Sequence, residues 1–137
     1  MRPYLLGTGG ARWWAEGITW YGPGNIGAAR SRRQYLTHFV EPLHAGFSDI
    51  TLQTDLLVCE GRYCGAHFYL HGTHTGTWLG GQATGRRARI RCGAQAHVEE
   101  NRIVEGWLII VVPRAFGDMG VDLYARAAAI AAKQAQS

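Results

Sequence analysis

The chain has 137 residues, a length typical of one compact domain. Apolar residues make up 47% of it and charged residues 18%, a balance that excludes a disordered or low-complexity protein. Its formal net charge is +4, and its arginines are scattered, whereas a nucleic-acid-binding protein usually gathers them on one dense basic face. We therefore expect a single globular domain over residues 1–137 that does not bind nucleic acid.

The sequence shows no segment that would hold the protein in a membrane. Its longest apolar run, residues 107–112, is far shorter than the ~20 residues needed to span a bilayer. The N-terminus has too short an apolar run for a signal peptide. Three cysteines, Cys59, Cys64 and Cys92, leave one unpaired under any disulfide scheme. Together these features favour a cytoplasmic protein with no membrane contact.

The first third of the chain predicts a lead-in, a strand and a helix. Residues 1–12 look irregular, and residues 17–27 indicate a short strand that ends at a Pro-Gly pair. Residues 28–45 indicate a helix, although Pro42 should end or kink it. The helix is predicted by a four-residue apolar spacing at Tyr35, Phe39, Leu43 and Phe47.

The rest of the chain predicts strands and one last helix. Residues 50–74 indicate two strands joined at Glu60-Gly61. Residues 88–97 and 102–112 indicate two more, joined by a hairpin turn. The Ala-rich tail predicts a closing helix. The order predicts an α+β fold in which a curved antiparallel sheet folds over a helix.

Several motifs carry a resemblance to a known family. The stretch "GTHTGTWLGGQATGRR" at 72–87, followed by "NRIVEGW" at 101–107, resembles the SnoaL-like polyketide cyclase, or ester cyclase, branch of the NTF2-like superfamily. The stretches "ITWYGPGNIG" and "HFVEPLHAGFSD" are similar to that family's first strand and pocket helix, so the resemblance spans residues 18–124. It implies an NTF2-like cone, a curved sheet wrapped over helices with a deep apolar pocket open at one end.

The resemblance also implies an activity, with one departure. In the cyclases, an Asp four residues beyond the Trp acts as general acid/base in an intramolecular aldol ring closure, and here that position is Val111. Three hypotheses stay open: an aldol-type cyclase or related lyase/isomerase with an altered acid/base site, a non-catalytic binding protein that lost the acid, or a purely structural dimerisation module with no ligand-sized cavity. The leading hypothesis implies a small hydrophobic or carbonyl-bearing ligand, no cofactor, and a homodimer packed through the outer face of the sheet.

A second departure concerns the N-terminus. Relatives usually carry a helical hairpin before the first strand, whereas only about seventeen residues precede Ile18 here. This predicts that the hairpin is shortened or missing. Either the pocket is then wider, or a partner subunit covers it, or the chain is an altered or truncated version of a longer parent.

The glycine-rich stretch contains the first candidate catalytic residue. His74 occupies the histidine position of the family's "THxG" motif, where an imidazole could serve as acid/base or donate to a substrate carbonyl. Alternatively, it bonds the loop and holds the turn. The glycines after it are predicted to serve backbone geometry. No metal site is expected, because positions four apart on a strand, such as His67 and His71, lie ~13 Å apart.

The remaining candidates are predicted to line the ligand pocket. Aromatic side chains offer flat apolar surface, although most aromatics at such spacing are ordinary core. Ala94 and Val111 face the cone interior if the alternation of relatives holds, and His38 is a proton carrier on the pocket helix, whereas Glu41 fits the helix surface better. The predicted substrate-binding residues are Trp20, His38, Phe39, Tyr69, His71, Ala94, Trp107 and Val111.

Overall fold

The computed structural model describes residues 13–24 and 26–136. The irregular lead-in expected at residues 1–12 lies outside the described residues. The expectation of a shortened N-terminal hairpin falls on the same segment.

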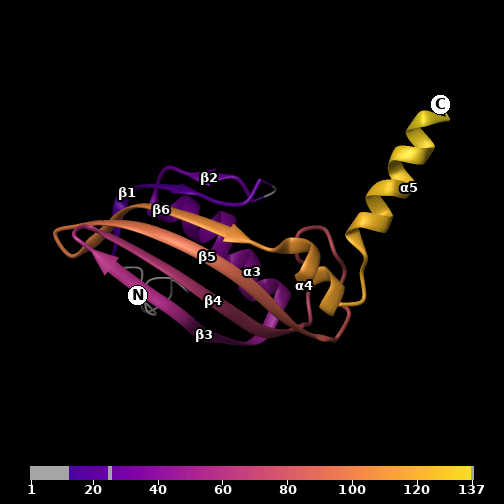
Figure 1. Ribbon diagram of the computed structural model, residues 1–137, viewed down its shortest axis with the longest axis horizontal. Coiled ribbons are helices and arrows are strands. Elements are labelled where there is room, and N and C mark those ends of the chain that lie inside the picture. Colours follow the sequence, from indigo (N-terminus) through magenta and orange to yellow (C-terminus); the bar gives the residue numbers. More distant parts are fainter. Residues whose placement is uncertain (1–12, 25, 137) are drawn as a thin grey trace.

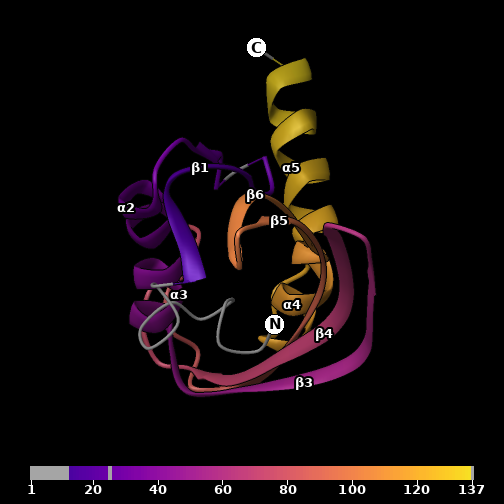
Figure 2. The same cartoon turned by 90° about the vertical axis from the view of Figure 1, so that its left-hand side faces the viewer.

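Six strands form one curved sheet with the order β2-β1-β6-β5-β4-β3 (Figure 1). Neighbouring strands are antiparallel except β1 and β6, which run parallel. The predicted α+β fold with a curved sheet over a helix is confirmed, and the sheet is mixed through this one parallel pair. The two edges do not meet, and the sheet stays open (Figure 2). The strands are β1 (Trp14–Tyr21), β2 (Ala28–Ala29), β3 (Phe47–Glu60), β4 (Tyr63–His74), β5 (Arg87–Glu99) and β6 (Arg102–Ile110).

Two tight turns confirm the predicted hairpins. Glu100 and Asn101 link β5 to β6 with φ of 50° and 62°. Positive φ at both central residues is the geometry of a type I′ turn, which matches the twist of the flanking strands. Gly61, with φ of 59°, begins the turn between β3 and β4. Both turns lie at the same end of the sheet, because β4 and β5 are antiparallel neighbours.

The predicted helix forms, but it starts later than expected. Ala28 and Ala29 pair with β1, and the helix begins after Ser31, whose hydroxyl accepts a hydrogen bond from the Gln34 amide. A serine at the N-cap position thus provides a hydrogen-bond acceptor for an amide that has no partner within the helix. The helical segment consists of α2 (Arg32–Tyr35), a π-helical turn η2 (Leu36–Val40) and α3 (Glu41–Gly46).

Pro42 does not end this helix. The Glu41 amide donates to the Leu36 carbonyl five residues earlier, which is π-helical bonding. Pro42 therefore falls in the first turn of α3, where a missing N–H is tolerated.

The core lies between the concave face of the sheet and this helical segment. The Trp14 and Tyr35 rings stack 4.2 Å apart, and the Trp20 and Phe39 rings stack 5.5 Å apart. Burial raises the pKa of the Tyr35 hydroxyl far above its ordinary value. The predicted four-residue stripe is confirmed for Tyr35, Phe39 and Leu43, which are buried on the helical segment, whereas Phe47 is buried as the first residue of β3.

Two helices follow the sheet. In α4 (Val112–Asp118), Phe116 stacks on Trp78 with ring centroids 5.8 Å apart, so the glycine-rich loop is packed at the end of the sheet opposite the hairpin turns. The predicted closing helix, α5 (Leu123–Ala135), is confirmed and projects away from the sheet with no buried residue (Figures 1 and 2). In the described part of the chain, no helix is long and apolar enough to cross a membrane.

Candidate functional site

The two faces of the sheet differ in chemistry along β5. Ala88, Ile90, Cys92 and Ala96 are buried and face the helices. Arg89 and Arg91 alternate with them and are exposed on the outer face. The expected alternation is confirmed, and it gives the concave face a wall of small apolar side chains.

A cavity of about 560 Å³ lies on the concave side, at the end of the sheet that carries both hairpin turns. This volume falls within the ~300–1,000 Å³ typical of small-molecule sites. Arg62 and Asn101, one from each turn, supply its polar groups. Its wall is mainly apolar and includes Trp13, Leu57, Ala96, Val98 and Ile103. We call it the inner cavity.

The wall of the inner cavity also contains a disulfide. Cys59 and Cys64 face each other across β3 and β4 with Cα atoms 4.1 Å apart, and their sulfurs are bonded. The third cysteine, Cys92, is buried in the core, and burial raises the pKa of its thiol to about 12. The odd number of cysteines therefore does not mean that all three are free thiols. A cytoplasmic location stays a prediction.

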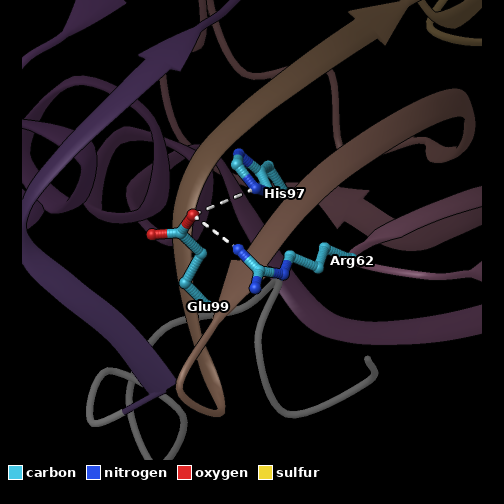
Figure 3. Close-up of polar contacts among 3 residues, drawn as sticks. All are labelled: Arg62, His97 and Glu99. Carbon is cyan, nitrogen blue, oxygen red and sulfur yellow. Dashed lines mark hydrogen bonds and ion pairs between the residues drawn. The ribbon is translucent and has the colours of Figure 1, made fainter.

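A polar cluster lies at the end of the sheet that carries the hairpin turns (Figure 3). The Glu99 Oε1 atom lies 3.4 Å from Nη1 of Arg62 and 3.5 Å from Nε2 of His97. The His97 ring stacks on Tyr63 with centroids 4.7 Å apart. The Val98 amide donates to the Arg62 carbonyl, which joins the two hairpins at this point. An adjoining cavity of about 340 Å³ is lined by Glu99 and shares Arg62 with the inner cavity.

The sequence analysis missed this cluster. The signal available was the concentration of charged residues beside the two predicted turns. Their proximity depends on the register of β4 with β5, which pairs Tyr63 with His97 and which no local pattern reveals.

His74, the predicted catalytic residue, ends β4 as expected but is only 1% exposed. Its Nδ1 atom lies 3.1 Å from the Thr84 hydroxyl oxygen, and its backbone pairs with Gly85 and Arg86. Its Nε2 atom is buried without a hydrogen-bond partner among the described residues. It lines neither the inner cavity nor the adjoining one. These contacts match the alternative in which the histidine holds the turn, and a catalytic role stays a prediction.

Trp20 and Phe39 lie in the core between the sheet and the helix. The space beside them measures only about 10 Å³, which is no larger than one water molecule. No cavity large enough for a substrate therefore lies beside these two rings. Their burial matches the alternative in which they are ordinary core residues.

Three other predicted ligand contacts are placed away from the inner cavity. Tyr69 and His71 lie on the outer face, where Tyr69 packs under the Arg89 guanidinium at 4.8 Å and His71 contacts Gln53 at 2.8 Å. His38 is exposed, with Nδ1 3.1 Å from the Ala28 carbonyl oxygen.

The predicted orientation is met by Ala94 and is wrong for Val111. Ala94 pairs with Ala66 and Leu108 on the concave face. Val111 is 40% exposed, because β6 ends at Ile110 and the chain turns into α4. It lines none of the cavities described above.

A second apolar surface lies on the outer face. A groove of about 390 Å³ runs across β3, β4, β5 and β6, and Trp107 lies in it. Leu56, Val58 and Ile109 also line it and are more than half exposed. We call this surface the outer groove. Exposed apolar patches are typical of interaction surfaces in soluble proteins.

No cluster suited to a metal ion occurs in the described ranges 13–24 and 26–136. Within them, no three His, Cys, Asp or Glu side chains come together in a way that could hold one.

Comparisons with known proteins agree with this architecture. The family model for SnoaL-like polyketide cyclases matches residues 9–111. A search of curated proteins finds no match.

Three solved structures are similar. IdmH from Streptomyces antibioticus, a proposed polyketide cyclase, is 26% identical with a TM-score of 0.71, covering 80% of this chain and 84% of IdmH. AclR from Streptomyces galilaeus, a proposed hydroxylase, is 20% identical with a TM-score of 0.71, covering 82% of this chain and 81% of AclR. A protein with a ketosteroid isomerase-like fold from Catenulispora acidiphila is 11% identical with a TM-score of 0.69, covering 86% of this chain and 87% of its own. At 20% and 11% identity, the similarities to AclR and to the Catenulispora acidiphila protein establish only a shared fold.

Proposed function

The chain belongs to the SnoaL-like polyketide cyclase family, and on that premise we propose that its inner cavity binds a small hydrophobic ligand that carries a carbonyl group. The observation that carries this proposal is the composition of the cavity. Apolar side chains form most of the wall, and two hydrogen-bond donors, Arg62 and Asn101, lie together at the hairpin end. A ligand with a flat apolar body and an oxygen at one end matches this distribution.

Two functions are compatible with such a site. The similarity to IdmH supports an aldol-type cyclase or a related lyase or isomerase. Val111 favours the alternative, a non-catalytic binding protein, because valine has no proton to transfer. Ligand binding in the inner cavity is common to both and is tested first.

Replacing Leu57 by tryptophan should weaken ligand binding at least about tenfold. Leu57 projects from β3 into the inner cavity and is 47% exposed, so a larger side chain can enter the cavity without displacing core residues. Isothermal titration calorimetry with 2-tetralone, a bicyclic hydrophobic ketone, would measure the change in Kd. A loss of about 1.4 kcal/mol corresponds to the tenfold change.

The matched control is Leu56→Trp. Leu56 is the preceding residue, is 52% exposed and lines the outer groove on the opposite face. Its replacement should leave the Kd for 2-tetralone within about twofold of the wild-type value, a difference of ~0.4 kcal/mol. Equal losses in both variants would place the ligand outside the inner cavity.

We further propose that the outer groove is the interface of a homodimer. Exposed apolar side chains occupy its centre. Arg89 and Arg91 flank it toward one end of the sheet, and Glu60 and Glu105 lie on the same face toward the other. A twofold axis through the groove would bring the basic end of one protomer to the acidic end of its partner, which is the self-complementarity an isologous dimer requires.

Ile109→Asp should convert such a dimer to a monomer. Ile109 is 70% exposed at the centre of the groove, so the aspartate would be hydrated in the monomer but buried at the interface. Sedimentation equilibrium would measure the mass of both proteins, and circular dichroism would confirm that the variant is folded. A wild-type protein that stays monomeric at about 100 µM would contradict the dimer. Its free energy of dimerisation would then be weaker than about 5.5 kcal/mol.

A further inference from the structure

We propose that the Cys59–Cys64 disulfide is a reversible redox site, and that its reduction by a small thiol loosens one wall of the inner cavity and weakens ligand binding there. The effect on the ligand rests on the binding function proposed above, whereas the redox chemistry does not. Both cysteines line the inner cavity, where they join β3 to β4 at the hairpin end.

The disulfide is accessible to a reductant. Cys59 is exposed and Cys64 is half-buried, and Cys59 lies on β3, the edge strand of the sheet. Thiol–disulfide exchange requires a thiolate to reach one of the two sulfurs, so exposed disulfides are the labile ones. A small thiol such as glutathione can therefore attack at Cys59.

The disulfide is not needed to hold the fold together. It joins residues only 5 apart in the sequence, inside a hairpin that is already paired along β3 from Phe47 to Glu60. Cross-linking so short a loop removes little entropy from the unfolded chain. The oxidised and the reduced protein should therefore both fold, as a reversible site requires.

The end of β3 is nevertheless weakly held without this bond. Every residue from Asp55 to Glu60 is exposed, so this end of the strand is not buried against the core. Its register with β4 shifts between Thr54 and Leu56, and a bulge of this kind bends a strand locally. In the described sheet, β4 is the one strand beside β3. When the disulfide is reduced, the backbone ladder with β4 is left to restrain the strand end.

This strand end forms part of the ligand site. Leu57, Cys59 and the turn residues Gly61 and Arg62 all line the inner cavity. The disulfide brackets the turn, so it fixes the backbone from which Arg62 reaches the ligand. A ligand that binds the reduced protein must first order this segment, and ordering mobile groups costs binding free energy. Reduction should therefore raise the Kd.

The redox step balances with a small thiol as the reductant. A thiolate attacks the Cys59 sulfur to form a mixed disulfide, and the Cys64 sulfur leaves as a thiolate. A second thiolate then attacks the small-thiol sulfur of the mixed disulfide and releases Cys59. Two small thiols are oxidised to one disulfide, their two electrons reduce the cysteine pair, and their two protons pass to Cys59 and Cys64. An excess of the small disulfide reverses both steps.

The third cysteine does not interfere. Cys92 is buried in the core, and burial raises the pKa of its thiol to about 12. The thiolate is the attacking form in exchange, so a buried thiol that stays protonated is inert. Exchange at Cys59 and Cys64 can therefore be measured without competition from Cys92.

The first measurement follows the disulfide without any ligand. The protein is equilibrated in a series of buffers of reduced and oxidised glutathione, quenched with acid and unfolded in N-ethylmaleimide, and mass spectrometry reports the labelling of each cysteine. We expect Cys59 and Cys64 to become labelled together as the buffers become more reducing, with Cys92 labelled throughout. A pair that stays bonded in the most reducing buffer, or a reduced protein that circular dichroism shows to be unfolded, would overturn the redox site.

The second measurement tests the link to the inner cavity. Calorimetry with 2-tetralone gives the Kd of the oxidised protein and of the same protein held reduced by a phosphine. We expect reduction to raise the Kd about fivefold, a difference of ~1 kcal/mol.

The matched control is the double variant Cys59→Ser, Cys64→Ser. It keeps two side chains of similar size and lacks the bond, so its Kd should equal that of the reduced wild type. Adding the phosphine should change this Kd by less than about twofold, or ~0.4 kcal/mol. A reductant effect as large in the double variant as in the wild type would show that the disulfide is not its source.

The outcomes separate this proposal from the binding function. Equal Kd values for the oxidised and reduced wild type would overturn the control of the cavity by the disulfide and leave the binding function standing. No binding in either state would overturn the binding function and, with it, the control of the cavity. The glutathione series decides the redox site in either case.

Discussion

Replacing Gly76 by alanine should lower the free energy of unfolding by about 2–3 kcal/mol, near the upper end for an overpacked site. A Cβ atom at Gly76 would overlap the carbonyl oxygen of Ala45 and lie 3.1 Å from its carbonyl carbon. Both atoms belong to the backbone, so no side-chain rotation relieves the overlap. The amides of Thr75 and Gly76 also donate to the Gly46 carbonyl at 3.0 and 3.1 Å, and a shift of the loop would weaken both bonds.

Urea unfolding followed by circular dichroism, at one protein concentration for all variants, measures this effect. Gly17→Ala is the control, because Gly17 is exposed on β1 and an added Cβ would meet nothing within 4 Å. Its stability should stay within about 0.5 kcal/mol of the wild type. Unfolding midpoints that are equal for the two variants would show that the loop is not packed against the end of α3.

The same loop shows what the sequence could establish. Local turn chemistry predicted that its glycines serve backbone geometry, and Gly80 and Gly85 have φ of 80° and 70°. The fold class and the two long hairpins were also predicted, because period-two alternation and turn residues are local signals. The parallel pairing of β1 with β6 could not be predicted, since it joins Trp20 to Gly106 across most of the chain.

The candidate site was less predictable, for a physical reason that Val111 illustrates. From Leu108 to Val112 every residue is apolar, so no alternation indicates which side chains face inward. The structure buries Leu108 and Ile110 and exposes Ile109, and this alternation directs Val111 outward as well. The cluster around Glu99 was hidden for a related reason, because it forms only when β4 and β5 are paired in their observed register.

Replacing Trp20 by alanine should lower the free energy of unfolding by about 3–5 kcal/mol, the range for removing a large buried aromatic. Trp20 is 2% exposed, and its ring lies 5.2 Å from Tyr35 and 5.5 Å from Phe39, with only a small space beside it. If Trp20 instead formed a ligand pocket, as its sequence context predicted, the same change would weaken 2-tetralone binding with little loss of stability. Urea unfolding and calorimetry on the same variant therefore separate a core residue from a ligand-binding residue.

Tyr21→Ala is the matched control for this prediction. Tyr21 follows Trp20 on β1, is 45% exposed and stacks on Trp107 with ring centroids 5.9 Å apart. Its loss should cost about 0.5–1.5 kcal/mol, the contribution of one aromatic pair. The two residues are adjacent and face opposite sides of the sheet. The difference between their losses in unfolding free energy therefore measures how much more burial on the concave face contributes to stability. Equal losses at both positions would mean that burial on that face does not set the stability of the fold.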